Sequence, residues 1–285
     1  MMTNLMAFID GSIYAKSVCD HAAWLAGRTG AAVELIHVLG RHGVSSEPEN
    51  LSGNIGLGAR TALLEELAEL DAKRAQLSQK RGRAILDDAK QRLSDAGVSD
   101  VTTKLRLDDL VEMVEDQESQ ADMIVIGKRG GGADFNKMHL GSNLERVVRS
   151  SHRPVLVTSR AFKPIRRFLI AFDGGPSVIK AIEEIAGNQI FADLDCELLG
   201  VGEATPESTR QMDASASLLR DAGYQVKTRF ASGQPETVII HEVENDAYDL
   251  MIMGAYGHSR IRNLIIGSTT TEMIRSCKIP VLLFR

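Results

Sequence analysis

Aromatic residues are scarce in this sequence of 285 residues, at 5% of the chain, whereas hydrophobic residues make up 44%. The apolar core must therefore consist mainly of aliphatic side chains, which favours a sheet buried between helices over an aromatic-rich all-β protein. No apolar run approaches the roughly 18 residues that a membrane span requires. Since the first residues also carry no basic segment ahead of an apolar one, we expect neither a membrane helix nor a signal peptide.

Cysteine and net positive charge are also lacking. The three cysteines, Cys19, Cys196 and Cys277, lie far apart and form no Cys-x-x-Cys pair. This spacing argues against a disulfide framework or a zinc site and favours a reduced, cytoplasmic setting. Lysine and arginine total 33 against 38 aspartates and glutamates, for a net charge of -5. Proteins that bind nucleic acid usually carry a basic face, so we expect no nucleic-acid partner.

What the sequence does contain is an internal repeat. The segment Leu169–Gly174 repeats the apolar-Asp-Gly pattern of Met6–Gly11, 163 residues further along, whereas Leu219–Gly223 follows Leu93–Gly97 by 126 residues. The chain is therefore a tandem duplication whose first copy carries 37 additional residues.

A polar segment that contains Pro164 separates the two copies and is typical of a short linker. We therefore expect two domains, at residues 1–160 and 165–285, with the additional residues of the first domain lying at about 39–93.

Within each copy, short apolar runs alternate with segments of helical spacing. This alternation predicts an α/β fold of two tandem Rossmann-like domains, each a five-stranded parallel sheet flanked by helices. The predicted strands are 5–9, 33–38, 101–107, 123–126 and 154–157 in the first copy, and 168–172, 197–201, 225–230, 250–253 and 281–284 in the second.

The insert is predicted to form a loop over 41–60 and a long helix over 61–93, weakened in its middle by Gly82. Its apolar stripe consists of Leu63, Leu67, Leu70, Leu77, Ile85, Ala89 and Leu93. Two interpretations stay open: the helix packs on its own sheet, or it binds a partner or a second copy of the chain.

Three features of each copy are expected at the carboxyl edge of its sheet, where open α/β sheets bind ligands. An aspartate follows the first strand, a glycine-rich loop follows the fourth, and a Gly-Ser step begins the next helix. In the second copy, Asp173 precedes the pattern Gly254-x2-Gly257-x9-Gly267-Ser268-Thr269-Thr270. A helix N-terminus of this kind binds phosphate well. Each residue alone could serve only as a turn or a helix cap, but the combination favours nucleotide binding.

These residues, together with the closing strand 279–282, resemble the universal stress protein (UspA) family over almost the whole chain, twice, and specifically its ATP-binding branch. The resemblance implies an adenine nucleotide alpha hydrolase-like fold. It also implies that Asp173 contacts the adenosine and that Val201 contacts the adenine through its backbone. The ribose and phosphates would be held by Gly254, Gly257, Gly267, Ser268, Thr269 and Thr270.

The first copy departs from this pattern. Its corresponding residues are Asp10, Val38, Gly127, Gly130, Gly141, Ser142 and Asn143. Ten residues instead of nine separate the last two loop glycines, and Leu144 stands where the second copy has Thr270. Lys128 and Arg129 could compensate electrostatically or lie in a solvated loop. We expect the second site to bind ATP, with Mg²⁺ as an accompanying ion, more tightly than the first, which could be empty.

Several catalytic patterns are missing: the sequence has no GxxxxGK[ST], no GxGxxG after the first strand and no GxSxG. His37 is expected in the core or at the edge of the sheet, and His258 either in a plain loop or in contact with phosphate. The leading hypothesis is a non-enzymatic, ATP-binding stress-response regulator. A slow ATPase or adenylate-transferring enzyme, and a nucleotide-free interaction scaffold that acts through the 61–93 helix, are the alternatives.

Members of the family also pair through the fifth strand. Here the two fifth strands, at 154–157 and 281–284, are short and apolar, and an uncovered apolar edge favours pairing. We therefore expect the two copies to form an internal pseudo-dimer, which leaves further homodimerisation open.

Overall fold

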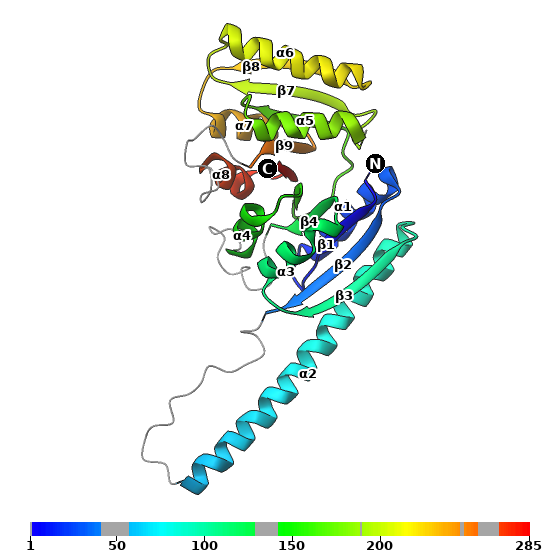
Figure 1. Cartoon of the computed structure of the whole chain (residues 1–285), viewed down its shortest axis with the longest axis vertical. Helices are drawn as coiled ribbons and strands as arrows, with labels where there is room; N and C mark the ends of the chain where they lie inside the picture. The colour runs from blue at the N-terminus through cyan, green and yellow to red at the C-terminus, as the bar shows by residue number, and fades with distance from the viewer. Residues whose placement is uncertain (1, 41–56, 129–141, 189, 246–247, 256–267) are drawn as a thin grey trace.

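The computed structural model describes residues 2–40, 57–128, 142–188, 190–245, 248–255 and 268–285, with the backbone alone for 57–62, 142, 268 and 269. Figure 1 shows strands and helices alternating through both halves. The first half contains β1 (Asn4–Phe8), α1 (Ala15–Thr29), β2 (Ala32–Leu39), α2 (Leu57–Asp95), β3 (Val101–Leu107), α3 (Leu110–Gln117), the 3-10 turn η2 (Glu118–Gln120), β4 (Met123–Gly127), α4 (Ser142–Ser150) and β5 (Val155–Thr158). The second half contains β6 (Arg167–Phe172), α5 (Pro176–Asn188), β7 (Asp195–Val201), α6 (Pro206–Asp221), β8 (Gln225–Ala231), α7 (Pro235–Glu244), β9 (Leu250–Gly254), α8 (Ser268–Ser276) and β10 (Val281–Phe284).

The strands of each half pair in the same order. The sheet runs β3-β2-β1-β4-β5 through the first half and β10-β9-β6-β7-β8 through the second. All pairs within a half are parallel, so the predicted α/β class and the two five-stranded parallel sheets are confirmed. No predicted strand boundary differs from the observed one by more than about two residues, a normal uncertainty in assigning ends.

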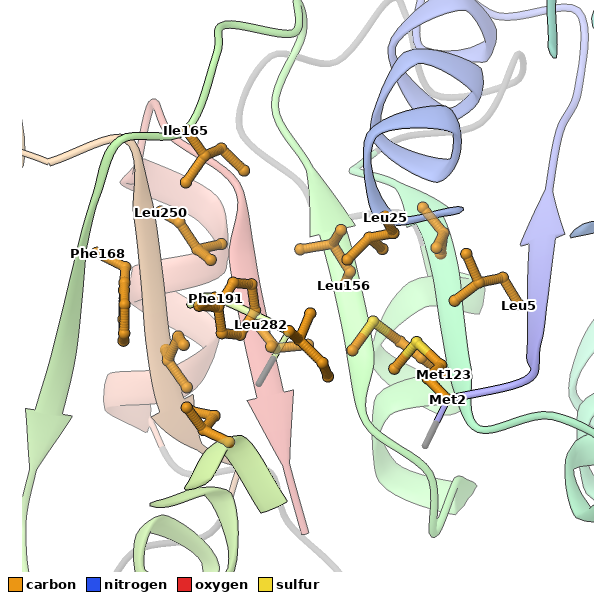
Figure 2. Packing of buried hydrophobic residues seen from close by; sticks show 14 of the residues in the cluster. Met2, Leu5, Leu25, Met123, Leu156, Ile165, Phe168, Phe191, Leu250 and Leu282 are labelled. Atoms are coloured by element: carbon orange, nitrogen blue, oxygen red, sulfur yellow. The ribbon is translucent and has the colours of Figure 1, made fainter. Parts of the chain in front are cut away.

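The two five-stranded sheets are joined into one ten-stranded sheet. Strand β5 pairs antiparallel with β10, with Leu156 opposite Leu282 and Val157 opposite Val281. Figure 2 shows Leu156 and Leu282 on these neighbouring strands. Each strand thereby covers the apolar edge that the other would expose, which removes two edges that would otherwise invite aggregation.

Helices cover both faces of the sheet, and buried side chains fill the space between the layers. On one face the core consists of side chains from α1, α2, α5 and α6 packed against the strands, and on the other it consists of side chains from α3, α4, α7 and α8. The central strands are buried on both sides, which explains why their sequences are nearly continuous apolar runs. In the described part of the chain, no helix combines the length and the apolar character that a bilayer crossing needs.

An aspartate before the fourth strand of each half fixes the beginning of the first strand. Asp122 Oδ2 accepts hydrogen bonds from the backbone N–H groups of Thr3 (2.6 Å) and Asn4 (3.0 Å). Asp249 Oδ2 does the same for Arg166 (2.9 Å) and Arg167 (3.1 Å). The repeated aspartates in the sequence therefore hold the two central strands of each half together.

Helix α2 is where the two halves differ most. It spans 39 residues, against 16 for its counterpart α6. Its observed start at Leu57 corrects the prediction, which had assigned 57–60 to a loop; the rest of that predicted loop, 41–56, lies outside the described residues. The predicted stripe packs on the sheet only in its last part, where Ala89 and Leu93 are buried. The interpretation that the whole helix packs on its own sheet is wrong for the first part.

Gly82 stands where α2 crosses the sheet. A methyl group built on Gly82 would lie 2.7 Å from Leu105 Cδ1 and 2.9 Å from His37 Cδ2. The glycine that appeared to weaken the helix therefore allows the close approach of the helix to β2 and β3.

Candidate functional site

The carboxyl ends of three strands meet at one edge in each half. In the second half, β6 lies between β7 and β9, with Phe172 level with Gly200 and Ala171 level with Met253. The chain leaves β6 toward β7 on one side and returns as β9 on the other, which defines a topological switch point. The first half repeats this arrangement with β1, β2 and β4.

An aspartate follows the central strand of each half and forms the same turn. Asp173 Oδ1 accepts a hydrogen bond from the Gly175 N–H at 2.9 Å, and Asp10 Oδ1 accepts one from the Ser12 N–H at 3.0 Å. Asp173 is exposed, and Asp10 is half-buried. A carboxylate held in this way at the strand end can also accept hydrogen bonds from hydroxyl or amine groups of a ligand.

The strands next to these aspartates end at or beside a valine. Val201 is the last residue of β7 and Val38 the last but one of β2, and both are half-buried. Gly202 follows Val201 with φ = 125°, a conformation that favours glycine, and its N–H donates to the Ala231 carbonyl at 2.9 Å. The backbone therefore turns sharply at the position where the sequence predicted an adenine contact.

Gly254 and Gly127 end the fourth strands of the two halves. A Cβ on Gly254 would lie 2.9 Å from Ser177 Cβ and 3.4 Å from the Val178 nitrogen. Gly254 is thus needed for the first turn of α5 to approach the end of β9, whatever else the position binds.

Helices α4 and α8 begin at Ser142 and Ser268, as predicted. Four predicted glycines, Gly130, Gly141, Gly257 and Gly267, lie outside the described residues, and so do the side chains of Ser142, Ser268 and Thr269. Asn143, in the first turn of α4, is exposed.

Thr270 makes a structural contact that the sequence did not predict. Its side chain is only 3% exposed, and its hydroxyl donates to the backbone carbonyl oxygen of Ala255 at 3.2 Å. This bond brings the first turn of α8 against the end of β9, so Thr270 positions the helix. Leu144, its counterpart in the first half, is equally buried at 3%. The exchange of threonine for leucine therefore changes an interior contact and does not remove a hydroxyl from an open loop.

Lys128 also differs from both interpretations of the sequence. The side chain is only 9% exposed, and Nζ donates to the backbone carbonyl oxygen of Cys277 in the second half. Its buried side chain therefore contributes to the contact between the two halves. Arg129 lies outside the described residues.

Two long polar side chains that the sequence analysis missed lie beside the turns of the aspartates. A methyl group built on Gly11 would lie 2.8 Å from Arg81 Nη2, and one built on Gly174 would lie 2.5 Å from Gln211 Oε1. Arg81 comes from α2 and Gln211 from α6, so the first site has a cation where the second has a neutral amide. Alignment of the two helices at Leu93 and Leu219 places Glu207 opposite Arg81 and Ile85 opposite Gln211, so the repeat in the sequence does not reveal this difference. A groove of about 340 Å³ between α5 and α6 begins at Gly174 and Gln211.

His37 and the three cysteines are buried in the interior of the protein. His37 is buried, and its Nδ1 lies 2.7 Å from the Ile9 carbonyl oxygen, which confirms it as a core residue. Burial raises the pKa of all three thiols, that of Cys19 to about 12. Among the described residues, no three His, Cys, Asp or Glu side chains are grouped so that they could hold a metal ion.

Comparison with known proteins places these features in one family. The model of the universal stress protein family matches residues 1–159 and 197–285. Universal stress protein Slr1230 of Synechocystis is 37% identical to this chain, over 100% of both chains. A solved universal stress protein from Archaeoglobus fulgidus is 19% identical, covers 99% of this chain and 96% of its own, and has a TM-score of 0.68, which shows a shared fold. A universal stress protein solved in complex with cAMP is 18% identical over 43% of this chain and 98% of its own, with a TM-score of 0.37.

Proposed function

Because the chain belongs to the universal stress protein family, we propose that it is a non-enzymatic regulator that binds ATP in its second half. The main support for this proposal is the hydrogen bond that the Thr270 hydroxyl donates to the Ala255 carbonyl oxygen. It holds the N-terminal turn of α8 at the carboxyl end of β9, beside the strand that leads into Asp173. The N-terminus of a helix and a carboxylate therefore lie at one switch point, a combination that supports binding of a phosphate and a ribose.

The described residues fit an adenine nucleotide in their chemistry. The N–H groups in the first turn of α8 have no partner within the helix and can donate to phosphate oxygens. The carboxylate of Asp173 can accept hydrogen bonds from ribose hydroxyls, and the backbone beside Val201 can pair with the adenine edge. Mg²⁺ would bind mainly through the phosphates, because it prefers phosphate oxygens together with few protein carboxylates.

The second half is the better candidate because only it has the complete spacing Gly254-x2-Gly257-x9-Gly267-Ser268. The first half has one more residue in this loop, and Arg81 lies over its turn. We propose that the first site, formed by Asp10, Val38 and Gly127 with the loop and helix that follow, binds ATP more weakly.

The two domains are proposed at residues 1–160 and 165–285, paired as an internal pseudo-dimer. The antiparallel pairing of β5 with β10 supports this arrangement. It is accompanied by contacts from Arg28, whose Nε donates to the Ile190 carbonyl at 2.7 Å, and from Trp24, which stacks on Phe191 with 6.1 Å between ring centroids.

Calorimetric titration of the full chain with Mg-ATP tests the nucleotide proposal. Asp173→Ala should weaken the tighter binding event by about tenfold or more, since it removes hydrogen bonds to a charged group. The matched variant Asp10→Ala should leave that event unchanged. Gly267→Val should abolish it, and Gly141→Val should not.

Unchanged tight binding in Gly267→Val would refute the second site. Mass spectrometry of small molecules released from the purified protein would identify the bound nucleotide. Incubation of the complex over hours distinguishes the regulator from the enzyme, because persistent ATP supports the regulator and steady formation of ADP or AMP supports a slow ATPase.

A further inference from the structure

The first part of α2 extends well past the sheet that its last part covers, as Figure 1 shows. Its counterpart α6 begins at Pro206, which corresponds to position 80 of α2, so the earlier residues of α2 have no equivalent in the second half. From residue 63 to 81 no side chain is buried, whereas Leu86, Ala89 and Leu93 are buried against the core. The protein therefore carries about 30 Å of projecting helix that its own sheet does not need.

This projecting helix has an apolar side. Leu63, Leu70 and Leu77 recur every seven residues and so lie along one side of the helix. Leu70 is 50% exposed and Leu77 is 65% exposed. With 3.6 residues per turn, the side of Leu70 and Leu77 lies roughly a third of a turn from the side that packs on the sheet. A second helix could therefore pack against these leucines from outside the body of the protein.

The charges of this segment change sign halfway along the helix. The acidic residues Glu65, Glu66, Glu69 and Asp71 come first, and the basic residues Lys73, Arg74, Lys80, Arg81 and Arg83 follow. A second copy of the helix placed parallel would set acid against acid and base against base. Placed antiparallel, the acidic part of each helix would face the basic part of the other, which is complementary.

One antiparallel register pairs the leucines and also sets Glu66 against Arg81. If Leu70 lies opposite Leu77 of the second copy, then Leu63 lies opposite Ala84 and Glu66 lies opposite Arg81 of that copy. The same register sets Lys73 opposite Arg74 at its centre, so the charges are complementary only toward its two ends. The leucine pairs and the two Glu66–Arg81 pairs favour the same helix of a second chain as the occupant of this surface.

Other surfaces for self-association are less suitable. The inner edges of the two half-sheets are already used by the pairing of β5 with β10. The outer edge strands β3 and β8 carry exposed basic residues, among them Arg106 and Lys227, and such residues oppose pairing between edges.

We propose that the chain forms a homodimer through antiparallel pairing of the α2 segments 63–84, with Leu70 of each chain packed against Leu77 of the other. This interface lies apart from the proposed ATP site of the second half, but it includes Arg81, which also lies beside Gly11 in the first half. In this dimer the additional residues of the first half join two chains. Within each chain, the two halves are already paired through β5 and β10.

Disulfide trapping in the full chain tests the register, because the three native cysteines are buried. The double variant Leu70→Cys/Leu77→Cys should form a covalent dimer under mild oxidation with oxidised glutathione. Neither single variant should do so, because seven helical residues separate identical positions by about 10 Å, beyond the ~7 Å limit between Cα atoms. Efficient cross-linking of Leu70→Cys alone would show parallel pairing and overturn the proposal.

Sedimentation velocity provides the second test. The wild type should be dimeric at micromolar concentrations. Leu70→Glu/Leu77→Glu should weaken the dimer by about tenfold or more, because each new carboxylate would be buried against the helix of the other chain. Leu64→Glu is the matched control: Leu64 is also 50% exposed, but it lies on another side of the same helix and should leave the dimer intact. All three proteins should be folded, since these side chains are exposed, and the double variant should lose only the stability that the dimer contact contributes. A wild type that stays monomeric, or a double variant that stays dimeric, refutes the proposal.

Discussion

His21 lies with its Nδ1 2.7 Å from the backbone carbonyl oxygen of Ser17, one turn earlier in α1. The ring is fully buried, packs edge-on against Phe162 at 4.9 Å, and its Nε2 has no hydrogen-bond partner among the described residues. Ser17 in turn donates its hydroxyl proton to the Ser159 carbonyl at 2.7 Å. The histidine therefore lies where the first helix contacts the segment between the two halves.

Acidification should destabilise the protein through this residue. Burial lowers the pKa of His21 below 6.5, although the Ser17 backbone bond and Asp20 act in the opposite direction. Because the unfolded chain then binds the proton more readily, the free energy of unfolding should fall as the pH decreases through about 6.5 and level off below the pKa of the folded state. Urea unfolding at several pH values measures this slope.

His21→Phe should reduce that slope, whereas Leu25→Ala, which removes buried apolar surface from the same helix, should lower stability similarly at each pH. An unchanged slope in His21→Phe would show that other groups cause the pH dependence.

Replacing two helical glycines by alanine should have opposite effects. Gly27 in α1 has no atom within 4 Å of a Cβ built on it, so Gly27→Ala should stabilise the protein by up to about 1 kcal/mol through helix propensity. At Gly82 the same gain is opposed by contacts of 2.7 Å with Leu105 and 2.9 Å with His37. Overpacking costs about 1–3 kcal/mol, so Gly82→Ala should be net destabilising. Thermal unfolding of both variants compares them, and stabilisation by Gly82→Ala would mean that the helix can move away from the sheet.

Asp122→Ala should cost about 1–3 kcal/mol, because it leaves the N–H groups of Thr3 and Asn4 without their acceptor. Burial alone would raise the pKa of Asp122, but these hydrogen bonds outweigh it and the pKa is lowered. Its contribution to stability is therefore fully present above the unfolded-state pKa of about 3.9 and is lost as the pH falls through the folded-state pKa. Asp116→Ala, at an exposed position of α3, should change stability by less than about 0.5 kcal/mol. Chemical denaturation at pH 7 and at about pH 3, below the unfolded-state pKa, measures both, and equal effects of the two variants would contradict the assigned role.

Removal of residues 281–285 should destabilise the first half as well as the second. The truncation deletes Val281, Leu282 and Leu283, each of which is almost fully buried, and exposes the edge of β5. The loss should amount to several kcal/mol and be accompanied by aggregation. Light scattering and thermal unfolding measure both effects. A truncated chain that remains soluble with unchanged stability would show that the pairing of β5 with β10 contributes little.

The strands were predictable because each is a short apolar run between turn residues, and Asp10 and Asp173 could be placed because they directly follow such runs. The start of α8 at Ser268 was predictable for a similar local reason. The contacts of Thr270 with Ala255 and of Lys128 with Cys277 were not predicted, because neither partner is a neighbour in the sequence. Arg81 and Gln211 were missed for the same reason, since each meets its glycine only after the helix has packed on the sheet.

The sequence by itself determined the duplication, the alternation of strands and helices in each half, and the additional residues of the first half, because these depend on local composition and spacing. Only the tertiary structure decided that β5 and β10 join the halves into one sheet and that Thr270 holds α8 against β9. It also decided that Gly82 lets α2 approach β2 and that the first part of α2 projects from the body. Each of these relationships depends on which residues from distant segments become neighbours, and local patterns do not specify that.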